Sequence, residues 1–355
     1  KAGRPGSNEV FPTHHPGPIT CVTTCIWKDM IATAGGGPKD HSVRLWSMSN
    51  HSLLEYRYFD EPVLSVSLHP TGLLALVGLP TAVTLQGITS EGMKKEAEFT
   101  DVKNCKVCKF SIGGELFAAA SQNVVKIFNT YTRAFCGDLK GHNDEITCMV
   151  WTSDGASLVT CGQDGSVYQW DVKKRLRVNE HVLKSTKYLA VALSENIHLP
   201  ECAIPDPDLG RVAIFTGEDR TTRRRMPGTG QLQLGADGFV GELCLVKENT
   251  AYALEKQNRL TEMDDVITAL AVSRDDRRLI AGTKQGYLCT YALPFNKAYA
   301  LDVDRVKTHD GRITSLSLSP EGTTLFSSAV DGTVYESCIT AYKPMAPPTN
   351  DDDDE

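Results

Sequence analysis

Short apolar runs recur along the whole chain, with turn-forming residues between them. Runs such as LLALVGL at 73–79 and VITALAV at 266–272 have the length of strands, and the 3.6-residue periodicity of an amphipathic helix is hard to find. The pattern therefore predicts an all-β fold. No apolar run approaches the ~20 residues needed to cross a bilayer, so we expect no contact with a membrane interior.

The apolar runs are organised in repeated units. Three units begin with similar segments, which are HHPGPIT at 14–20, GHNDEIT at 141–147 and THDGRIT at 308–314. A strand–turn–strand run ends each unit, and its last positions include Trp46, Phe128, Trp170, Tyr291 and Ser337. Repeats of about 40–45 residues with Gly-His near the start and Trp-Asp near the end are typical of WD-repeat propeller blades. The chain therefore predicts a WD40 β-propeller.

The spacing of the repeats predicts seven blades. His15 and His142 are 127 residues apart, which suits three units, whereas the 167 residues from His142 to His309 exceed three units by about 40. We therefore predict an inserted region at about 195–262 within the fifth blade. The predicted single propeller spans 8–344, between a disordered start at 1–7 and an acidic disordered tail at 345–355 that leads to a linker.

The seventh unit lacks a fourth strand of its own. It runs into KPMAPPTNDDDDE, where Pro and acidic residues oppose strand pairing. The N-terminal run NEVFPTHH stands where an outer strand before the first blade belongs. We predict that this run pairs into the last blade and closes the ring, which would remove long exposed sheet edges.

The His, Asp and Trp of each unit are the first candidate functional residues. In the fourth blade we predict a hydrogen-bonded chain from Trp170 through Thr160 and His142 to Asp164. The same types recur as His15, Thr33, Asp40 and Trp46 in the first blade, and as His309, Ser327 and Asp331 in the seventh. The alternative is a hydrolase with Thr160 as nucleophile and His142 as its base. A catalytic site has no reason to recur around a ring, so the pattern favours a structural role.

Other chemical motifs are weak or absent. The chain has no HExxH or GxSxG motif, and GTGQLQLG at 228–235 lacks the Lys-Ser/Thr of a phosphate-binding loop. Eleven cysteines are an odd count and are spread through strand-like runs, so we expect reduced thiols. Cys105 and Cys108 form a C-x-x-C, but on an extended strand they would point to opposite faces. We therefore expect no enzyme, no cofactor and no metal.

The net charge of the chain and the placement of its arginines bear on the class of partner that it could bind. The net charge of −7 argues against a nucleic-acid or anionic-lipid binder. A local cluster of Arg220, Arg223, Arg224 and Arg225 in EDRTTRRRMPGTGQ is a candidate site for an acidic or phosphorylated partner. The alternative is a solvated loop.

Longer stretches carry a more specific resemblance. VLSVSLHPTGLLALVG, CKFSIGGELFAAASQNVVKIF, LKGHNDEITCMVWTSDGASLVTCGQDGSVYQWDV and VLKSTKYLAVALS resemble the second propeller of the family of cilia- and flagella-associated protein fifty-seven. The resemblance covers most of the chain apart from about 195–262 and the ends. It implies an intracellular axonemal protein of the motile cilium or flagellum, with two tandem propellers and a coiled coil, associated with inner dynein arms.

These observations favour a non-catalytic interaction scaffold in the axonemal cytoskeleton. Its expected partners are dynein or regulatory-complex subunits, with tubulin as a further candidate, and the chain itself is expected to be a monomeric fragment of a longer protein. The alternative is a WD40 adaptor or substrate receptor in a ubiquitin ligase or a trafficking complex, which uses the same fold.

Overall fold

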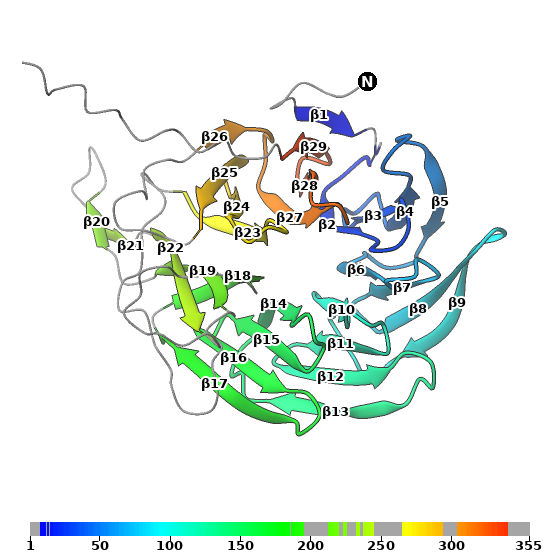
Figure 1. Ribbon diagram of the computed structural model, residues 1–355, viewed down its shortest axis with the longest axis horizontal. Helices are drawn as coiled ribbons and strands as arrows, with labels where there is room; N and C mark the ends of the chain where they lie inside the picture. The colour runs from blue at the N-terminus through cyan, green and yellow to red at the C-terminus, as the bar shows by residue number, and fades with distance from the viewer. Residues whose placement is uncertain are drawn as a thin grey trace, which may run out of the picture.

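The computed structural model describes residues 8–11, 13, 15–184, 186–194, 212–219, 223–225, 232–234, 237–244, 265–293 and 304–339. Every regular element among these residues is a β-strand, and the described part of the chain contains no helix that could serve as a membrane span. The strands form seven sheets arranged as a ring, together with one small separate hairpin (Figure 1). The structure confirms the all-β WD40 propeller predicted from the sequence.

The first four sheets follow one another along the chain, and each is a four-stranded antiparallel meander. The first holds β2 (Ile19–Thr24), β3 (Ile31–Gly35), β4 (Ser42–Trp46) and β5 (Leu53–Tyr58). The second holds β6 (Ser65–Leu68), β7 (Leu74–Gly78), β8 (Val83–Thr89) and β9 (Gly92–Phe99). The third holds β10 (Cys108–Phe110), β11 (Leu116–Ser121), β12 (Val124–Asn129) and β13 (Phe135–Lys140), and the fourth β14 (Ile146–Trp151), β15 (Ser157–Gly162), β16 (Ser166–Asp171) and β17 (Leu176–Val182).

The remaining sheets complete the ring. A three-stranded sheet holds β18 (Thr186–Ser194), β19 (Val212–Asp219) and β22 (Asp237–Cys244), and the hairpin is β20 (Arg223–Arg225) with β21 (Leu232–Leu234). The next sheet holds β23 (Ile267–Val272), β24 (Arg278–Thr283), β25 (Tyr287–Ala292) and β26 (Asp304–Lys307). The last holds β27 (Ile313–Leu318), β28 (Thr324–Ala329), β29 (Val334–Cys338) and β1 (Asn8–Phe11).

The range predicted to hold an insertion in the fifth blade includes strands of a sheet. The range 195–262 contains β19 and β22, which pair with each other and with β18 to form the three-stranded sheet. The sequence departs from the repeat in the connections between these strands and not in the strands themselves. The boundaries predicted at 1–7 and 345–355 lie outside the described residues.

The N-terminal strand joins the last sheet, as the sequence predicted. β1 pairs antiparallel with β29, so that Phe11 lies opposite Val334 and Asn8 lies opposite Ser337. Phe11 is buried between Trp46 of the first sheet and Phe326 of the last, with both ring pairs edge-to-face at 5.9 and 5.8 Å. The two ends of the ring are therefore joined by backbone pairing and by an aromatic cluster.

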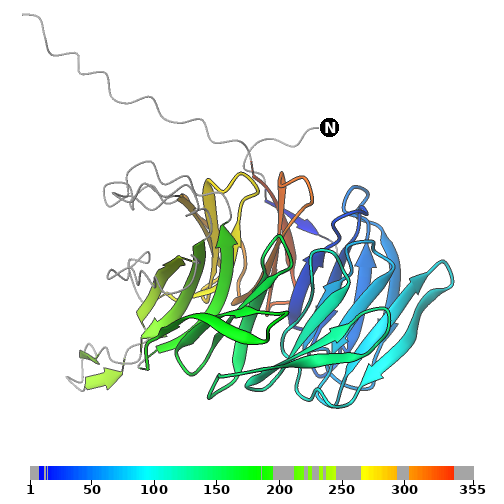
Figure 2. The same ribbon diagram turned by 60° about the horizontal axis from the view of Figure 1, so that its bottom comes forward.

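Figure 2 shows the sheets standing side by side around the ring, and within the first and fourth sheets burial is greatest in the second strand and least in the outer strand. The second strands β3 and β15 are almost completely buried, because neighbouring sheets cover both of their faces. The outer strand β5 is mostly exposed along its length. The continuous apolar runs of the sequence are thus the inner strands, and the rim is formed by more polar strands.

Candidate functional site

The fourth sheet contains the complete hydrogen-bonded chain that the sequence predicted. The Trp170 indole Nε1 donates to Thr160 Oγ1 at 2.9 Å, and Oγ1 lies 2.8 Å from His142 Nε2. His142 Nδ1 lies 3.1 Å from Oδ2 of Asp164. Strand β16, strand β15 and two loops are therefore connected by a single line of polar contacts.

Donor and acceptor roles follow from the chemistry of the four groups. The indole can only donate, so the Thr160 oxygen accepts from Trp170 and gives its own proton to His142 Nε2. Nδ1 of His142 then carries the proton that is donated to Asp164. Each group has a partner, which avoids the cost of leaving a buried polar atom unsatisfied.

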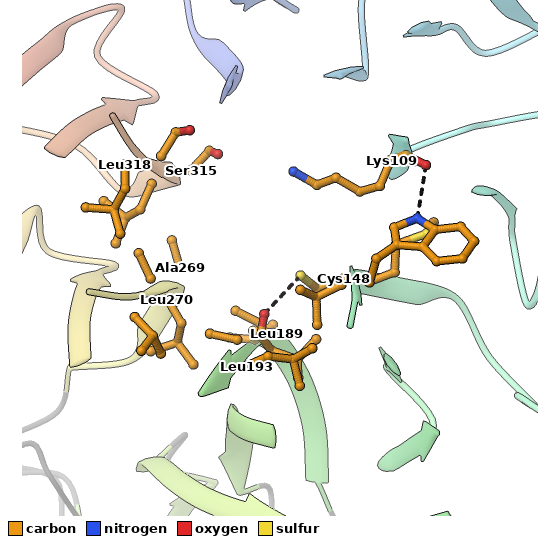
Figure 3. A pocket seen from close by; sticks show the side chains of 18 of the residues that line it. Lys109, Cys148, Leu189, Leu193, Ala269, Leu270, Ser315 and Leu318 are labelled. Atoms are coloured by element: carbon orange, nitrogen blue, oxygen red, sulfur yellow. Dashed lines mark hydrogen bonds between the residues drawn. The ribbon is translucent and has the colours of Figure 1, made fainter. Parts of the chain in front are cut away.

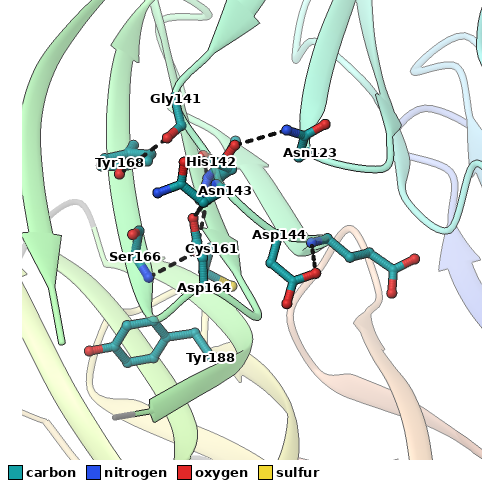
Figure 4. A network of polar contacts seen from close by, with 12 residues as sticks. Asn123, Gly141, His142, Asn143, Asp144, Cys161, Asp164, Ser166, Tyr168 and Tyr188 are labelled. Atoms are coloured by element: carbon teal, nitrogen blue, oxygen red, sulfur yellow. Dashed lines mark hydrogen bonds and ion pairs between the residues drawn. The ribbon is translucent and has the colours of Figure 1, made fainter. Parts of the chain in front are cut away.

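Asp164 also organises the loops on either side of the histidine (Figure 4). Its carboxylate accepts the backbone N–H of Asn143 at 2.8 Å and that of Ser166 at 3.0 Å. Burial acts to raise the pKa of the Asp164 carboxyl, but the hydrogen bonds from His142 and these N–H groups outweigh it and lower the pKa. The residue is therefore an anionic centre that fixes two turns.

The first sheet repeats this arrangement. Trp46 Nε1 donates to Thr33 Oγ1 at 3.1 Å, Thr33 Oγ1 lies 2.8 Å from His15 Nε2, and His15 Nδ1 contacts the carboxylate of Asp40. Burial lowers the pKa of His15 and exceeds the opposing effect of Asp40. The imidazole is thus neutral near pH 7, in agreement with a donor–acceptor role.

The last sheet departs from the prediction at one contact. His309 Nε2 lies 2.9 Å from Ser327 Oγ, but His309 Nδ1 lies 2.8 Å from Thr333 Oγ1 and 3.5 Å from Asp331 Oδ2. Thr333 was not identified from the sequence, and its hydroxyl links the histidine to Asp331 by a 2.6 Å hydrogen bond. Ser337 occupies the tryptophan position, and no indole donates to Ser327 in the described structure.

Other sheets have different contacts in place of the His–Thr–Trp network. Phe128, at the tryptophan position of the third sheet, stacks on Phe117 at 5.2 Å. In the sheet of β23–β26, Asp265 is buried before β23, accepts the backbone N–H of Gln285 at 3.2 Å and pairs with Arg305 at 3.3 Å. Asp265 was missed because its unit does not begin with the Gly-His segment.

The networks do not have the access that a catalytic site needs. The side chains of Thr33, Thr160 and Ser327 are fully buried, and each hydroxyl is within hydrogen-bonding distance of a histidine. A nucleophile must reach its substrate. The hydrolase alternative therefore has no support in the geometry of these residues.

The expectation for the C-x-x-C motif is wrong. Cys105 lies before β10 and is flanked by bends, so the chain between it and Cys108 is not an extended strand, and the two side chains pack in one cluster. Both side chains are buried, and Cys108 Sγ also lies 3.3 Å from Ser65 Oγ. No group of three or more metal-ligating side chains occurs among the described residues.

The predicted arginine cluster is described only in part. Arg220 lies outside the described residues. Arg223, Arg224 and Arg225 form β20, which pairs with β21 away from the ring in Figure 1. The structure does not bring this strand together with the histidine networks.

A surface that the sequence did not single out lies on one face of the ring. We call it the apolar patch, and it consists of exposed side chains in the hairpin loops of the first three sheets: Ile26, Trp27, Leu73, Ile112 and Tyr131. The side chain of Trp27 is 70% exposed and that of Tyr131 is 62% exposed. Adjacent exposed apolar and aromatic side chains are typical of protein-interaction surfaces.

Contacts between neighbouring loops hold the apolar patch together. The backbone N–H of Trp27 donates to the Pro70 carbonyl at 3.1 Å, which joins the first loop to the second. His69 Nε2 lies 3.2 Å from the Gly114 carbonyl, which joins the second loop to the third. The ring of Tyr131 packs edge-to-face against that of His69 at 6.1 Å. The loops that carry the patch are therefore joined to one another across three sheets.

Known proteins show similarity over most of the chain. The family described as "WD domain, G-beta repeat" matches residues 7–47, 134–171 and 302–335. Cilia- and flagella-associated protein 57 of Mus musculus is 29% identical over 323 residues, which is 90% of this chain and 22% of the mouse protein. Cilia- and flagella-associated protein 57 C of Tetrahymena thermophila is 31% identical over 44% of this chain and 13% of its own length.

A third similarity is shorter. Echinoderm microtubule-associated protein-like 4 of Xenopus laevis is 26% identical over 42% of this chain and 16% of its own length. The chain thus spans less than a quarter of each of these three relatives. The chain therefore carries WD repeats in a ring of sheets, and most of its length is similar to cilia- and flagella-associated protein 57.

Proposed function

We propose that this chain is a non-catalytic protein-interaction module of motile cilia or flagella, and that it docks a partner in an axonemal complex associated with inner dynein arms. The observation that carries the proposal is the apolar patch, which presents Trp27 and its neighbours on a rigid face. Exposed aromatic side chains on preformed scaffolds bind partners at a low cost in conformational entropy. The names of the mouse and Tetrahymena relatives support the ciliary setting.

The proposed architecture is a seven-bladed propeller in which the sheet of β18, β19 and β22 is the fifth blade. This sheet stands between the sheet of β14–β17 and that of β23–β26, in the place that the repeat spacing assigns to it. A closed ring of blades keeps its shape when it binds a partner. The His–Thr–Trp networks of the first and fourth blades serve that rigidity, and no cofactor or metal is needed for the role.

The proposed partners are axonemal proteins, namely subunits of dynein or its regulatory complex, or tubulin. The similarity to a microtubule-associated protein supports a setting on microtubules. Tubulin and this chain are both acidic, so long-range electrostatics oppose a broad contact between them. An apolar contact through the patch does not depend on net charge, and it should persist at high salt.

Capture from axonemal extract tests the docking proposal. The paired substitution Trp27→Ser and Leu73→Ser removes the exposed apolar groups of two adjacent loops, and we expect it to abolish capture of axonemal proteins by the chain. The matched control is Leu54→Ser and Tyr58→Ser, which removes two exposed apolar groups from β5 on the rim. Equal capture by the patch variant and the wild type would contradict the proposed face. Selective recovery of ubiquitin-ligase or coat subunits would instead favour the adaptor alternative.

A further inference from the structure

A cavity of about 690 Å³ lies at the axis of the ring (Figure 3). Inner strands β14, β18, β23 and β27 line it, and Lys109 of β10 extends into it. Cys148 of β14 is among the lining residues and is half-buried. Its thiol donates to the Val191 carbonyl at 3.7 Å, which holds the sulfur at the cavity wall.

A second cysteine lies opposite Cys148 on the neighbouring strand. Cys148 and Cys161 are register partners on β14 and β15, at a β-bulge that follows Ile146. Directly opposite residues on antiparallel strands present their side chains on the same face of the sheet. The two side chains pack in one cluster, and Cys161 itself is fully buried. The pair therefore has one sulfur open to the cavity and one protected by the sheet.

We propose that Cys148 and Cys161 form a peroxide-reactive dithiol, in which Cys148 is the site of oxidation and Cys161 closes an intrachain disulfide. Cys148 is the accessible sulfur, and the Lys109 ammonium in the same cavity stabilises a thiolate there. Opposite positions on adjacent strands bring the two sulfurs together without a change of fold.

The local chemistry supports this division of roles. The hydrogen bond from Cys161 lowers the pKa of the Cys148 thiol to about 6, with a smaller contribution from the charge of Lys109. Burial raises the pKa of Cys161. The two directions agree with oxidation at Cys148 first and resolution by Cys161 second.

The reaction balances with hydrogen peroxide as the oxidant. The Cys148 sulfur attacks one peroxide oxygen, so that an S–O bond forms and the O–O bond breaks, and the leaving hydroxide takes a proton from solvent to become water. The Cys161 sulfur then attacks the Cys148 sulfur, an S–S bond forms and the S–O bond breaks. The second hydroxide takes the Cys161 proton and leaves as water. Two thiols are oxidised and one peroxide is reduced.

The chain contains its own controls. Cys105 and Cys108 also touch each other, but both are fully buried and neither lines the cavity. Cys338 is exposed and has no cysteine partner in hydrogen-bond contact among the described residues. If contact alone were sufficient, the first pair would oxidise. If exposure alone were sufficient, Cys338 would react first.

The test treats the folded 355-residue chain with limiting hydrogen peroxide, blocks the remaining thiols under denaturing conditions and maps the linked peptides by mass spectrometry. We expect a Cys148–Cys161 disulfide, with Cys105 and Cys108 recovered as blocked thiols. In Cys161→Ser we expect a dimedone adduct on Cys148, because the sulfenic acid can no longer be resolved. Lys109→Gln should slow the oxidation several-fold. Oxidation of Cys338 in the wild type without any Cys148–Cys161 link would overturn the proposal.

Discussion

The Oγ1 atom of Thr160 lies 2.8 Å from His142 Nε2 and also accepts the Trp170 indole N–H at 2.9 Å. One hydroxyl thus satisfies two side chains from different parts of the blade. Because the hydroxyl is fully buried, water cannot replace it when it is removed. Removing this atom would therefore leave two buried polar groups of the fourth blade without their partner.

Thr160→Val tests this dependence with almost no change in volume. We expect a loss of about 1–3 kcal/mol for each group left unsatisfied, Trp170 Nε1 and His142 Nε2, measured by urea unfolding. Ser327→Ala is the matched comparison, because its hydroxyl serves His309 and no indole. It should cost less than Thr160→Val. Equal costs would show that the indole contact contributes nothing.

Phe11→Ala tests the closure of the ring. Phe11 is 1% exposed, and its truncation would leave a cavity between Trp46 and Phe326, with an expected loss of about 3–5 kcal/mol in the free energy of unfolding. Val10→Ala, one residue earlier on the same strand, is the control because Val10 is 59% exposed. If both substitutions cost the same small amount, β1 does not contribute to closure through its core contact.

Alanine substitutions at two glycines separate the cost of backbone strain from the cost of a steric clash, because both glycines have a positive φ. Gly165 and Gly155 have φ of 75° and 65°, in a region that residues other than glycine seldom adopt. A Cβ on Gly165 would lie 2.1 Å from the Leu183 carbonyl oxygen, whereas one on Gly155 would meet nothing within 4 Å. Gly155→Ala should therefore cost about 1–2 kcal/mol, and Gly165→Ala distinctly more. Thermal unfolding of both variants measures the difference.

Stability should fall as the pH falls below neutrality. Burial lowers the pKa of His15 and of His309, so the unfolded chain binds more protons than the folded chain once the pH drops below about 6.5. Each neutral histidine contributes stability that is fully present above that value and is lost toward the lower folded-state pKa. The lowered pKa of Asp164 adds a further loss in more acidic solution. The urea midpoint should fall between about pH 7.5 and about pH 5, and an unchanged midpoint would contradict the neutral histidines.

The sequence could predict the parts of the fold that repeat. Strand-length apolar runs, the Gly-His segments and the pairing of the N-terminal run into the last blade were all predictable, because each reflects a local pattern or a missing edge partner. The first-blade and fourth-blade contacts followed from residue types at fixed spacing. Thr333 did not, because whether His309 reaches Asp331 directly depends on the conformation of one turn.

Features that depend on neighbouring blades were not predictable. Trp27 and Ile112 are 85 residues apart, and only the ring brings their loops to one face. The contact between Cys105 and Cys108 required knowledge that the chain turns before β10. The strands within 195–262 were missed because their connections are longer than the repeat expects.

The most direct test of the central claim is proximity labelling in motile ciliated cells. A labelling enzyme would be fused to the full protein that carries this chain, and the labelled neighbours compared with those of a version that lacks residues 8–339 and of one with Trp27→Ser and Leu73→Ser. We predict that dynein-arm neighbours are labelled by the intact protein and lost from both altered versions. Unchanged neighbours in both would contradict a docking role for this propeller.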